Sequence, residues 1–538
     1  MRLSNLTSTN FIRARLVVVA LRLHTMGLLS PLGFLADMAW RISGRSVPLA
    51  KIAFWLNLLS EQFDRAQRIV THHSHPNKPP SHTAWAMRVR GAIEDRQPVD
   101  LETLRQTLPE RSKKRSVTPI NDLLYVTSGS LPHMQSGYAH RSHGLMRALA
   151  AQGTSVVCVT RPGFPADTPS FANPKDITDA RRQEIVDGVT YHRIESPLRT
   201  KKSALAYIDA ASHALEKFYL EQRPRVIMAA SNHLTALPAL IAARRVGLPF
   251  IYEVRGFWEI TQASRDPTYL NSVRYDNAVT LESLTAQEAD LVLTLNQPMA
   301  GELSQRGVER NNIRLLPNAC APEKFAPRLR DQALARQLGI PSDTPVLGFI
   351  GSFTVYEGLD DLILACGELR RRNLNFRLVL VGDELIFNSV HIPMLPRLRA
   401  LITKEGLDGY VHLPGRVPAD DVPRWYSLID IAPFPRKAMA VSELVPPLKP
   451  VEAMAMSKAI ITSDVLGLAD FVQDGLTGLM FPKGDIGAFA DGLERLLRDE
   501  TLRNTLGMNA RSWVVAERSW SQIALIVQEA LRDLGDID

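Results

Sequence analysis

The sequence predicts an α/β protein in which two doubly wound parallel-sheet domains follow one another behind a helical region. From about residue 120 onwards, short apolar runs alternate with segments of helical periodicity, which is typical of parallel sheets covered by helices. The alternation becomes loop-like around PNACAPEKFAP, residues 317–327, and then restarts. The chain has 538 residues, which is more than one hydrophobic core usually organises.

The first part of the chain, residues 1–110, is predicted to be a helical extension. Apolar clusters alternate there with Arg and Lys at helical spacing, as in FIRARLVVVALRLHTMGLL and PLAKIAFWLNLLSEQFDRAQRIV. Two interpretations remain open: a helical bundle packed on the main body, or a basic amphipathic surface lying on anionic lipid. Neither a membrane span nor a cleavable signal is expected, because polar residues and Pro31 interrupt the apolar run at 16–21.

The first α/β domain is expected over residues 118–325, after the basic linker RQTLPERSKKRSVTP. Its opening pattern is a strand, a glycine turn, a helix and a second strand, which together make a βαβ unit. The corresponding segments are DLLYVTS, MQSGYAHRSHG, LMRALAAQG and SVVCVTRPG, and the alternation continues through RVIMAAS, LTALPALIAARRVG, PFIYEVRG and ADLVLTL.

The second α/β domain is expected over residues 326–515. Its predicted strands include PVLGFIGS, FRLVLVGDE, YVHLPGR, DIAPFP and AIITSDV, and its helices DDLILACGELRRRN, DDVPRWYSL and PVEAMAM. The closing helices break near Arg518, and the last one, residues 516–538, could cross back to the first domain. Ligands of such sheets bind beyond the carboxyl ends of the strands, so the two domains should form one cleft.

Composition and charge limit the partners. The formal net charge is +7, which suits nucleotide phosphates, a polyanionic glycan or an acidic membrane surface. Nucleic acid is not expected, because the sequence has no zinc-finger spacing, no RNP-like motif and no heptads behind a basic region. The cysteines, Cys158, Cys320 and Cys366, stand far apart, which argues against disulfides or a zinc site and fits a reducing cytoplasm.

The most specific segment runs from Ser442 to Asp464, SELVPPLKPVEAMAMSKAIITSD, and the loop DGLTGLMFPKGD follows it. Pro450 suits the first turn of a helix, where its missing N–H costs nothing. The free N–H groups of that turn would favour an anion such as a diphosphate. Glu452 lies just inside the same end, where its carboxylate could accept two hydrogen bonds from a ribose diol.

Candidates in the first domain follow its predicted strands. Gly137 can let the backbone approach a ligand, and Arg141 lies four residues after it. His233 comes directly after RVIMAAS, at a carboxyl end. Arg255, in YEVRG, could face an anionic acceptor or the phosphates, and Glu259 could touch the acceptor. Arg255 and Glu259 could equally form a structural ion pair.

Together these segments resemble the family 4 glycosyltransferases with the GT-B fold, in which two Rossmann-like domains face a cleft. The resemblance runs from about Leu123 to the C-terminus and is carried by SGYAHRSHG, YEVRGFWE, LPNACAPEKF, GSFTVYEGLDDLILA, LVLVGDE, PLKPVEAMA and DGLTGLMFP. It implies metal-independent transfer, with retention of anomeric configuration, from a UDP- or GDP-linked sugar to a glycan, lipid-linked or other hydroxyl acceptor. No further cofactor is implied.

The resemblance also assigns roles to residues. It implies that Glu452 holds the donor ribose and that His233 lies near the donor sugar. It places the donor site along Gly351, Ser352, Leu448 and Gly415. The family's acidic residue eight positions before Glu452 is replaced here by Leu444, and Glu443, one residue away, is the nearest acid.

A second departure concerns the diphosphate. The family carries Arg and Lys in a GRLxxxKG turn, whereas the matching residues here are Ser352 and Glu357. Some cation must stabilise the leaving diphosphate when no metal is bound. We expect Lys449 and Arg436 to supply that charge from the segment before Glu452.

Alternatives remain at this stage. One alternative is a GT-B protein that binds nucleotide sugars without turnover or acts as a scaffold, for which the missing cations are the best support, and a nucleotide-sugar epimerase is a further alternative. We expect a cytoplasmic protein, associated with the inner membrane face if the basic helices bind lipid, in surface polysaccharide or glycolipid synthesis. The base, the sugar and the acceptor are not identified by the sequence.

Overall fold

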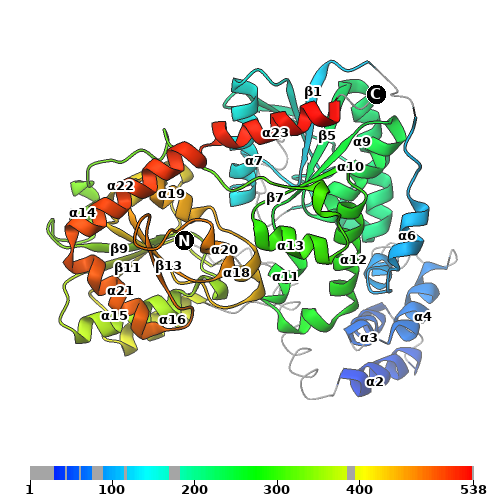
Figure 1. Cartoon of the computed structure of the whole chain (residues 1–538). Helices are drawn as coiled ribbons and strands as arrows, with labels where there is room; N and C mark the ends of the chain where they lie inside the picture. Colours follow the sequence, from blue (N-terminus) through cyan, green and yellow to red (C-terminus); the bar gives the residue numbers. More distant parts are fainter. Residues whose placement is uncertain are drawn as a thin grey trace.

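The computed structural model describes residues 29–42, 45, 47–59, 62–75, 86, 89–113, 118–168, 182–384 and 394–535. Figure 1 shows two α/β domains side by side, with a smaller helical unit beneath the first domain. The two predicted sheet domains are therefore confirmed. The apolar run at 16–21 lies outside the described residues.

The first domain is built on an eight-stranded sheet with the order β3-β4-β2-β1-β5-β6-β7-β8. Neighbouring strands are parallel except for the antiparallel pair β3 and β4. The strands are β1 (Asn121–Thr127), β2 (Val156–Thr160), β3 (Gln183–Val186), β4 (Val189–His192), β5 (Pro224–Ala230), β6 (Phe250–Val254), β7 (Leu291–Thr294) and β8 (Ile313–Leu315).

The helices of this domain cover both faces of the sheet. They are α7 (Gly137–Ala151), α9 (Ala204–Gln222), α10 (His233–Val246), α11 (Trp258–Ala263), α12 (Val273–Gln287) and α13 (Gln297–Gln305). The strands β6 and β7 are buried along their whole length, as expected for a sheet covered on both sides.

Residues 137–144 differ from the prediction: the sequence places them in a glycine turn, but they already belong to helix α7. Ser136 caps the helix by accepting a hydrogen bond from the Ala139 N–H at 3.3 Å. Leu145 and Leu149 then face the core on one side of the helix. Glycines at both ends, Gly137 and Gly144, make this segment resemble a turn in the sequence, and the cap and the buried face decide its helical conformation. The β3–β4 hairpin was not predicted either.

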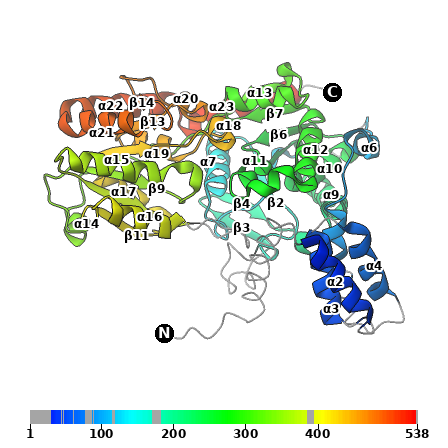
Figure 2. The same ribbon diagram turned by 90° about the horizontal axis from the view of Figure 1, so that it is seen from below.

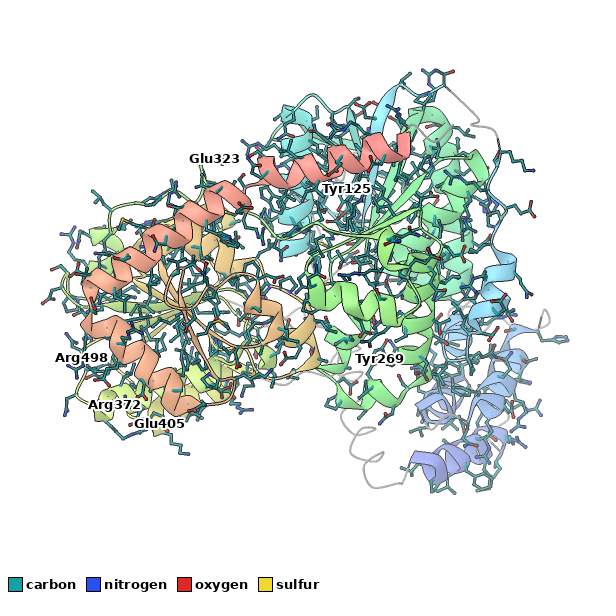
Figure 3. The ribbon with its side chains drawn as sticks, in the orientation of Figure 1. Tyr125, Tyr269, Glu323, Arg372, Glu405 and Arg498 are labelled. Carbon is teal, nitrogen blue, oxygen red and sulfur yellow. The ribbon has the colours of Figure 1, made fainter. Side chains whose placement is uncertain are left out.

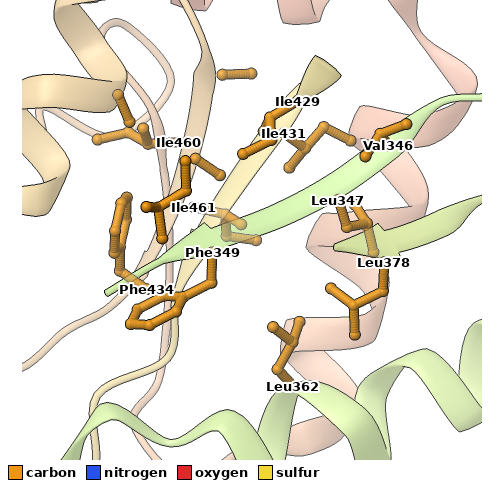
Figure 4. Packing of buried hydrophobic residues seen from close by; sticks show 14 of the residues in the cluster. Val346, Leu347, Phe349, Leu362, Leu378, Ile429, Ile431, Phe434, Ile460 and Ile461 are labelled. Carbon is orange, nitrogen blue, oxygen red and sulfur yellow. The ribbon is translucent and has the colours of Figure 1, made fainter. Parts of the chain in front are cut away.

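The second domain has a six-stranded parallel sheet with the order β11-β10-β9-β12-β13-β14. Figure 4 shows Phe349 and Leu347 of the central strand β9 among buried residues of the same sheet, such as Leu378, Ile431 and Ile461. The strands are β9 (Val346–Ile350), β10 (Arg377–Val381), β11 (Val411–Gly415), β12 (Ile431–Phe434), β13 (Ala459–Ser463) and β14 (Leu479–Phe481).

Helices surround this second sheet. They are α14 (Gln332–Gln337), α15 (Leu359–Arg371), α16 (Met394–Lys404), α17 (Val422–Leu428), α18 (Ala440–Leu444), α19 (Lys449–Ala455), α20 (Leu466–Ala469), α21 (Ile486–Arg498) and α22 (Glu500–Glu517). Pro450 lies in the first turn of α19, as the sequence predicts.

The last helix, α23 (Trp520–Gly535), leaves the second domain and packs on the first (Figure 1). Ile523, Val527 and Leu531 join the same core as Tyr125 of β1. Trp520 lies so close to α7 that a Cβ on Gly144 would approach its Nε1 to 2.3 Å. The carboxyl end of the chain thus ties the two domains together.

The helical unit contains α2 (Leu29–Ile42), α3 (Val47–Leu59) and α4 (Phe63–Ser74), and α6 (Leu101–Thr107) lies between it and the first domain. It has a core of its own that includes Trp40, Phe54 and Ile69. Figure 2 shows the unit projecting from the first domain. In the parts of the chain that the structure describes, no helix is both long and apolar enough to cross a membrane.

Candidate active site

Glycines line the carboxyl ends of three neighbouring strands in the second domain. Gly351 follows β9, Gly382 follows β10 and Gly415 ends β11. The Gly382 N–H donates to the Gly415 carbonyl at 2.9 Å. A Cβ on Gly382 would lie 1.9 Å from the Gly351 carbonyl oxygen, so no side chain fits there. These strand ends therefore pack too closely for a side chain at Gly382, and they lie at the carboxyl edge of the sheet, where ligands of such folds bind.

Lys449 reaches this glycine edge from the start of α19. A Cβ on Gly351 would lie 2.1 Å from the Lys449 Cε, so the lysine stem occupies the space that a side chain would need. The ammonium lies 4.9 Å from the centre of the Phe349 ring. The sequence could not show this contact, because the two residues are nearly one hundred positions apart in the chain. The structure therefore places a cation beside Gly351 and Ser352, where the expected Arg is missing.

Glu357 holds this lysine. Its Oε1 lies 2.7 Å from the Lys449 Nζ, and the carboxylate is buried. Burial alone would raise the pKa of Glu357, but the positive charges of Lys449 and Arg436 hold that pKa below its ordinary value. The family pattern has a lysine at the position of Glu357. Here that position is an acid, and the cation is Lys449 of α19.

Arg436 lies on the same side of the site. It is buried, its Nη1 donates to the Val445 carbonyl at 2.7 Å, and its guanidinium stacks on Tyr356 at 5.4 Å. Its Nε has no hydrogen-bond partner within the described residues. Arg436 therefore contributes positive potential next to Glu357, while one of its N–H groups is fixed by the backbone.

Glu452 lies in the first turn of α19, one helical turn after Lys449. Burial raises the pKa of Glu452 to about 7, against the opposing effects of Lys449 and Lys324. Its side chain accepts no hydrogen bond from the described part of the protein. This half-buried carboxylate is therefore available to a ligand.

Glu443 is occupied elsewhere. Its Oε1 lies 2.8 Å from the Lys483 Nζ, and its Oε2 accepts the Leu466 N–H at 3.0 Å. Both oxygens are thus engaged at the start of α20 and in the loop after β14. A contact between Glu443 and a sugar hydroxyl would have to displace one of these bonds.

The segment 439–448 joins the second domain to the first. The Leu444 carbonyl accepts from Asn296 Nδ2 at 3.0 Å, and the Pro446 carbonyl accepts from Asn318 Nδ2 at 2.8 Å. The Leu448 side chain lies 3.4 Å from where a Cβ on Gly137 would be. Gly137, at the start of α7, and Leu448, next to Lys449, therefore belong to one interdomain site.

His233 begins α10 at the carboxyl end of β5, and Glu282 of α12 fixes its ring. Glu282 Oε1 accepts from the His233 backbone N–H at 2.7 Å and lies 2.9 Å from His233 Nδ1. Tyr252 donates its hydroxyl to the other oxygen. Burial would raise the pKa of Glu282, but the hydrogen bonds and charge of His233 lower it. Because the carboxylate accepts, Nδ1 carries a proton and Nε2 remains for other contacts.

We predict that Glu282→Gln lowers kcat about tenfold and leaves nucleotide affinity unchanged. The amide removes the negative charge that orients His233 but keeps the size and shape of the glutamate side chain. Steady-state kinetics and calorimetry would check this. Glu288→Gln, which changes a partly exposed partner of Arg244 beyond the end of α12, is the matched control. An equal loss of kcat in both variants would contradict the positioning role.

The remaining first-domain candidates form buried networks. Arg141 donates from Nε to Glu253 at 2.9 Å and from Nη2 to the Leu316 carbonyl at 2.8 Å. Arg255 donates from Nη1 to Ser142 at 2.8 Å and lies 3.7 Å from Glu253. Tyr125, inside the first domain (Figure 3), completes the network by donating to Glu253. Arg141 therefore holds the strand ends together, while two nitrogens of Arg255, Nε and Nη2, have no hydrogen-bond partner among the described residues.

Glu259 is fully buried and pairs with Arg306 at 2.7 Å. The Arg306 guanidinium stacks on Phe257 at 4.3 Å. Of the two interpretations left open for Glu259, the structural ion pair is the one that the geometry supports, because the carboxylate does not reach the surface of the site.

Comparisons with known proteins agree with this architecture. The family described as glycosyl transferases group 1 matches residues 331–513, and the one described as glycosyl transferase 4-like domain matches residues 136–319. Each match falls within one of the two sheet domains, and the match to the first domain begins after β1. The chain belongs to the family 4-like glycosyltransferases of the GT-B fold. These are transferase enzymes, and the N-terminal helical unit lies outside both matches.

Relatives of this glycosyltransferase share about a quarter of its sequence. The alpha-D-kanosaminyltransferase of Streptomyces kanamyceticus is 25% identical over 298 residues, covering 55% of this chain and 73% of the relative. A lipopolysaccharide 1,2-N-acetylglucosaminetransferase of Salmonella typhimurium is 27% identical over 226 residues, covering 42% of this chain and 57% of the relative.

Solved structures show the same fold. The sucrose-phosphate synthase of Thermosynechococcus elongatus has a TM-score of 0.59 at 21% identity, covering 77% of this chain and 98% of that one. HepE of Anabaena, solved with UDP-glucose, has a TM-score of 0.58 at 18% identity, covering 76% of this chain and 99% of that one. At these identities the likeness establishes the fold alone.

Proposed function

We propose that this glycosyltransferase moves a sugar from a UDP- or GDP-linked donor to a hydroxyl of a glycan or lipid-linked acceptor, with retention of anomeric configuration and without a metal ion. The observation that carries the proposal is the position of Lys449 beside Gly351, one helical turn before the unengaged carboxylate of Glu452. A cation for the diphosphate and a carboxylate that can accept hydrogen bonds from a ribose thus lie in the same turn of α19, beside the glycine edge of the second sheet.

The relatives support a nucleotide-sugar donor. HepE was solved with UDP and with UDP-glucose, and a mannosyltransferase of Mycobacterium tuberculosis, 26% identical over 223 residues, is described as GDP-mannose-dependent. Several relatives act on lipopolysaccharide or phosphatidylinositol mannoside, according to their names. These names favour a glycan or glycolipid acceptor for this chain.

In the proposed reaction, the acceptor hydroxyl attacks the anomeric carbon from the face that the diphosphate leaves. The new carbon–oxygen bond forms as the bond to the phosphate breaks, and the hydroxyl proton passes to the departing phosphate oxygen. Lys449, with the potential of Arg436, stabilises the charge that develops on the diphosphate. His233 lies on the opposite domain, near the sugar.

Calorimetry of UDP, GDP, ADP and their sugar conjugates, with EDTA present, tests the donor. We expect one nucleotide to bind and Glu452→Gln to weaken that binding at least about tenfold in a folded protein. Turnover in EDTA, with NMR of the product's anomeric proton, tests metal independence and retention. A folded protein that binds no nucleotide would overturn the donor proposal, and binding without turnover with any hydroxyl acceptor would favour a non-catalytic protein.

The raised pKa of Glu452 gives a second prediction. Because the ribose hydroxyls donate to an ionised carboxylate, donor binding should release a proton near pH 7. With a pKa of about 7 in the free protein, affinity for the nucleotide sugar should fall about tenfold from pH 8 to pH 6. The sugar diphosphate stays ionised in this range, so it adds no proton of its own. Titrations in buffers of different ionisation enthalpy would measure the release.

Glu452→Gln should remove the pH dependence of whatever binding remains. It should also raise Tm at pH 8 but not at pH 5. A carboxyl group whose folded pKa is raised contributes stability at low pH, and this contribution is lost as the pH rises to 7 and above. Equal pH dependence in both proteins would contradict the assignment of Glu452.

A further inference from the structure

The N-terminal helical unit, defined as α2, α3 and α4, has one apolar outer face. Phe34, Leu35, Met38 and Ile42 of α2 are each between 44% and 78% exposed. At 100° per residue these four positions fall within an arc of about 100° on the helix. Trp55 and Ile52, on the neighbouring helix α3, are also exposed. Single exposed apolar residues are ordinary, whereas a one-sided group on adjacent helices indicates a partner.

The opposite side of the same unit is polar. The exposed residues of α4 are Asp64, Gln67, Arg68, Thr71 and Ser74, while Ile69 and Val70 face the core. The unit shares one core with Ala86, Val89 and Ile93, and the exposed residues Phe34, Leu35, Met38 and Ile42 of α2 are not part of that core. A soluble three-helix unit that needed no partner would carry polar side chains on α2 as well.

The charges around this face are positive. In the described parts of residues 29–75 the basic side chains are Arg41, Arg45, Lys51, Arg65 and Arg68, against the two acids Asp37 and Asp64. Asp37 is buried and paired with Arg41 at 3.1 Å. Exposed cations thus border the apolar residues, and the complementary surface is anionic.

Among the described residues, nothing covers this face. Figure 2 shows α2 and α3 at the end of the projection, away from both sheet domains. Helix α2 has 14 residues, about 21 Å at 1.5 Å per residue, which is too short to span a bilayer. A helix of this kind lies in the plane of a membrane surface, with its apolar side chains inserted and its cations at the headgroups.

We infer that the outer face of α2 and α3 docks this glycosyltransferase on an anionic lipid bilayer. Met38, Ile42 and Trp55 insert at the headgroup boundary, while Lys51 and Arg45 lie against the anionic headgroups. Docking holds the cleft near an acceptor carried in the membrane. It does not depend on the transfer reaction, and the two can be tested separately.

The test is co-sedimentation of the full-length protein with vesicles of phosphatidylcholine and phosphatidylglycerol, and with vesicles of phosphatidylcholine alone. We compare Met38→Glu/Ile42→Glu with Gln67→Glu/Thr71→Glu, which adds the same charge at the same spacing on the polar face of α4. We expect the first variant to lower the partition coefficient into anionic vesicles at least about tenfold, and the second to lower it by less than about threefold. Nucleotide binding by calorimetry should be equal in all three proteins.

Fluorescence gives a second readout. Brominated lipid should quench the fluorescence of Trp55, measured as the difference in emission between the wild type and Trp55→Phe, because Trp55 enters the headgroup region.

Four results would overturn the inference. The first is that the wild type does not bind anionic vesicles, and the second is an equal loss of binding in both double variants. The third is that the wild type binds no vesicles but self-associates, and that only Met38→Glu/Ile42→Glu abolishes this self-association. The fourth is that removal of residues 1–28 abolishes vesicle binding while Met38→Glu/Ile42→Glu binds normally.

Discussion

Lys449→Met is expected to lower kcat/KM about 10²–10³-fold, because it removes the cation beside Gly351 that stabilises the leaving diphosphate. The lysine is ion-paired with buried Glu357 at 2.7 Å, so the single variant also leaves a buried carboxylate with less compensation. Its Tm should therefore fall as well. Steady-state kinetics and thermal unfolding measure the two effects.

A double variant separates these effects. Glu357→Gln/Lys449→Met replaces the ion pair by two neutral side chains, so we expect Tm to recover while kcat/KM stays low. Recovery of both would show that Lys449 is structural only. Lys437→Met is the matched control, because Lys437 is also a paired lysine but its ammonium lies 2.8 Å from Asp360 at the start of α15. It should leave kcat/KM within about threefold of the wild type.

Glu253→Gln is expected to destabilise the first domain by about 3–5 kcal/mol, because it leaves the buried guanidiniums of Arg141 and Arg255 without their counter-charge. Glu253 is fully buried and lies 2.9 Å from Arg141 and 3.7 Å from Arg255. Burial would raise its pKa, but the two arginines lower it. Its stabilising effect is therefore present above the ordinary glutamate pKa and is lost as the pH falls below it.

Thermal unfolding at pH 7 would check this prediction, and a fall in Tm of roughly 10 °C is expected for a domain of this size. Glu494→Gln is the control. Glu494 pairs with Arg372 and Arg498 on the outer edge of the second domain, where both arginines are labelled in Figure 3. It should leave Tm nearly unchanged because exposed ion pairs contribute little. Similar Tm values for the wild type and Glu253→Gln would contradict the prediction, because Glu253 would then not be needed as the counter-charge of the two arginines.

Much of the architecture could be predicted because local patterns report it. The apolar runs of β9 and β13 are buried on both faces of a parallel sheet, and such strands stand out by composition alone. Pro450 marks the first turn of α19 for a local reason, its missing N–H. The sequence does not predict the β3–β4 hairpin or the helical conformation of residues 137–144, because long-range packing rather than local propensity decides them.

The site was predicted in part. Glu452, Lys449 and Gly351 were named from a linear motif, and the structure brings them to one edge of the second sheet. The sequence indicates Glu357 only as a position where an expected cation is missing, and it does not indicate Glu282. No local signal marks Glu282, since it lies within α12, 49 positions from His233.

The sequence by itself determined the fold class, the position of the Pro450 helix and the family, because these depend on periodicity and on short motifs. Only the tertiary structure decided which charges meet. Lys449 pairs with Glu357, and Glu282 fixes the ring of His233, although each pair comes from different elements. Arg141 and Glu259 are buried by elements that are distant in the sequence. Coulomb interactions act through space and depend on burial, so their partners are fixed by packing and not by spacing along the chain.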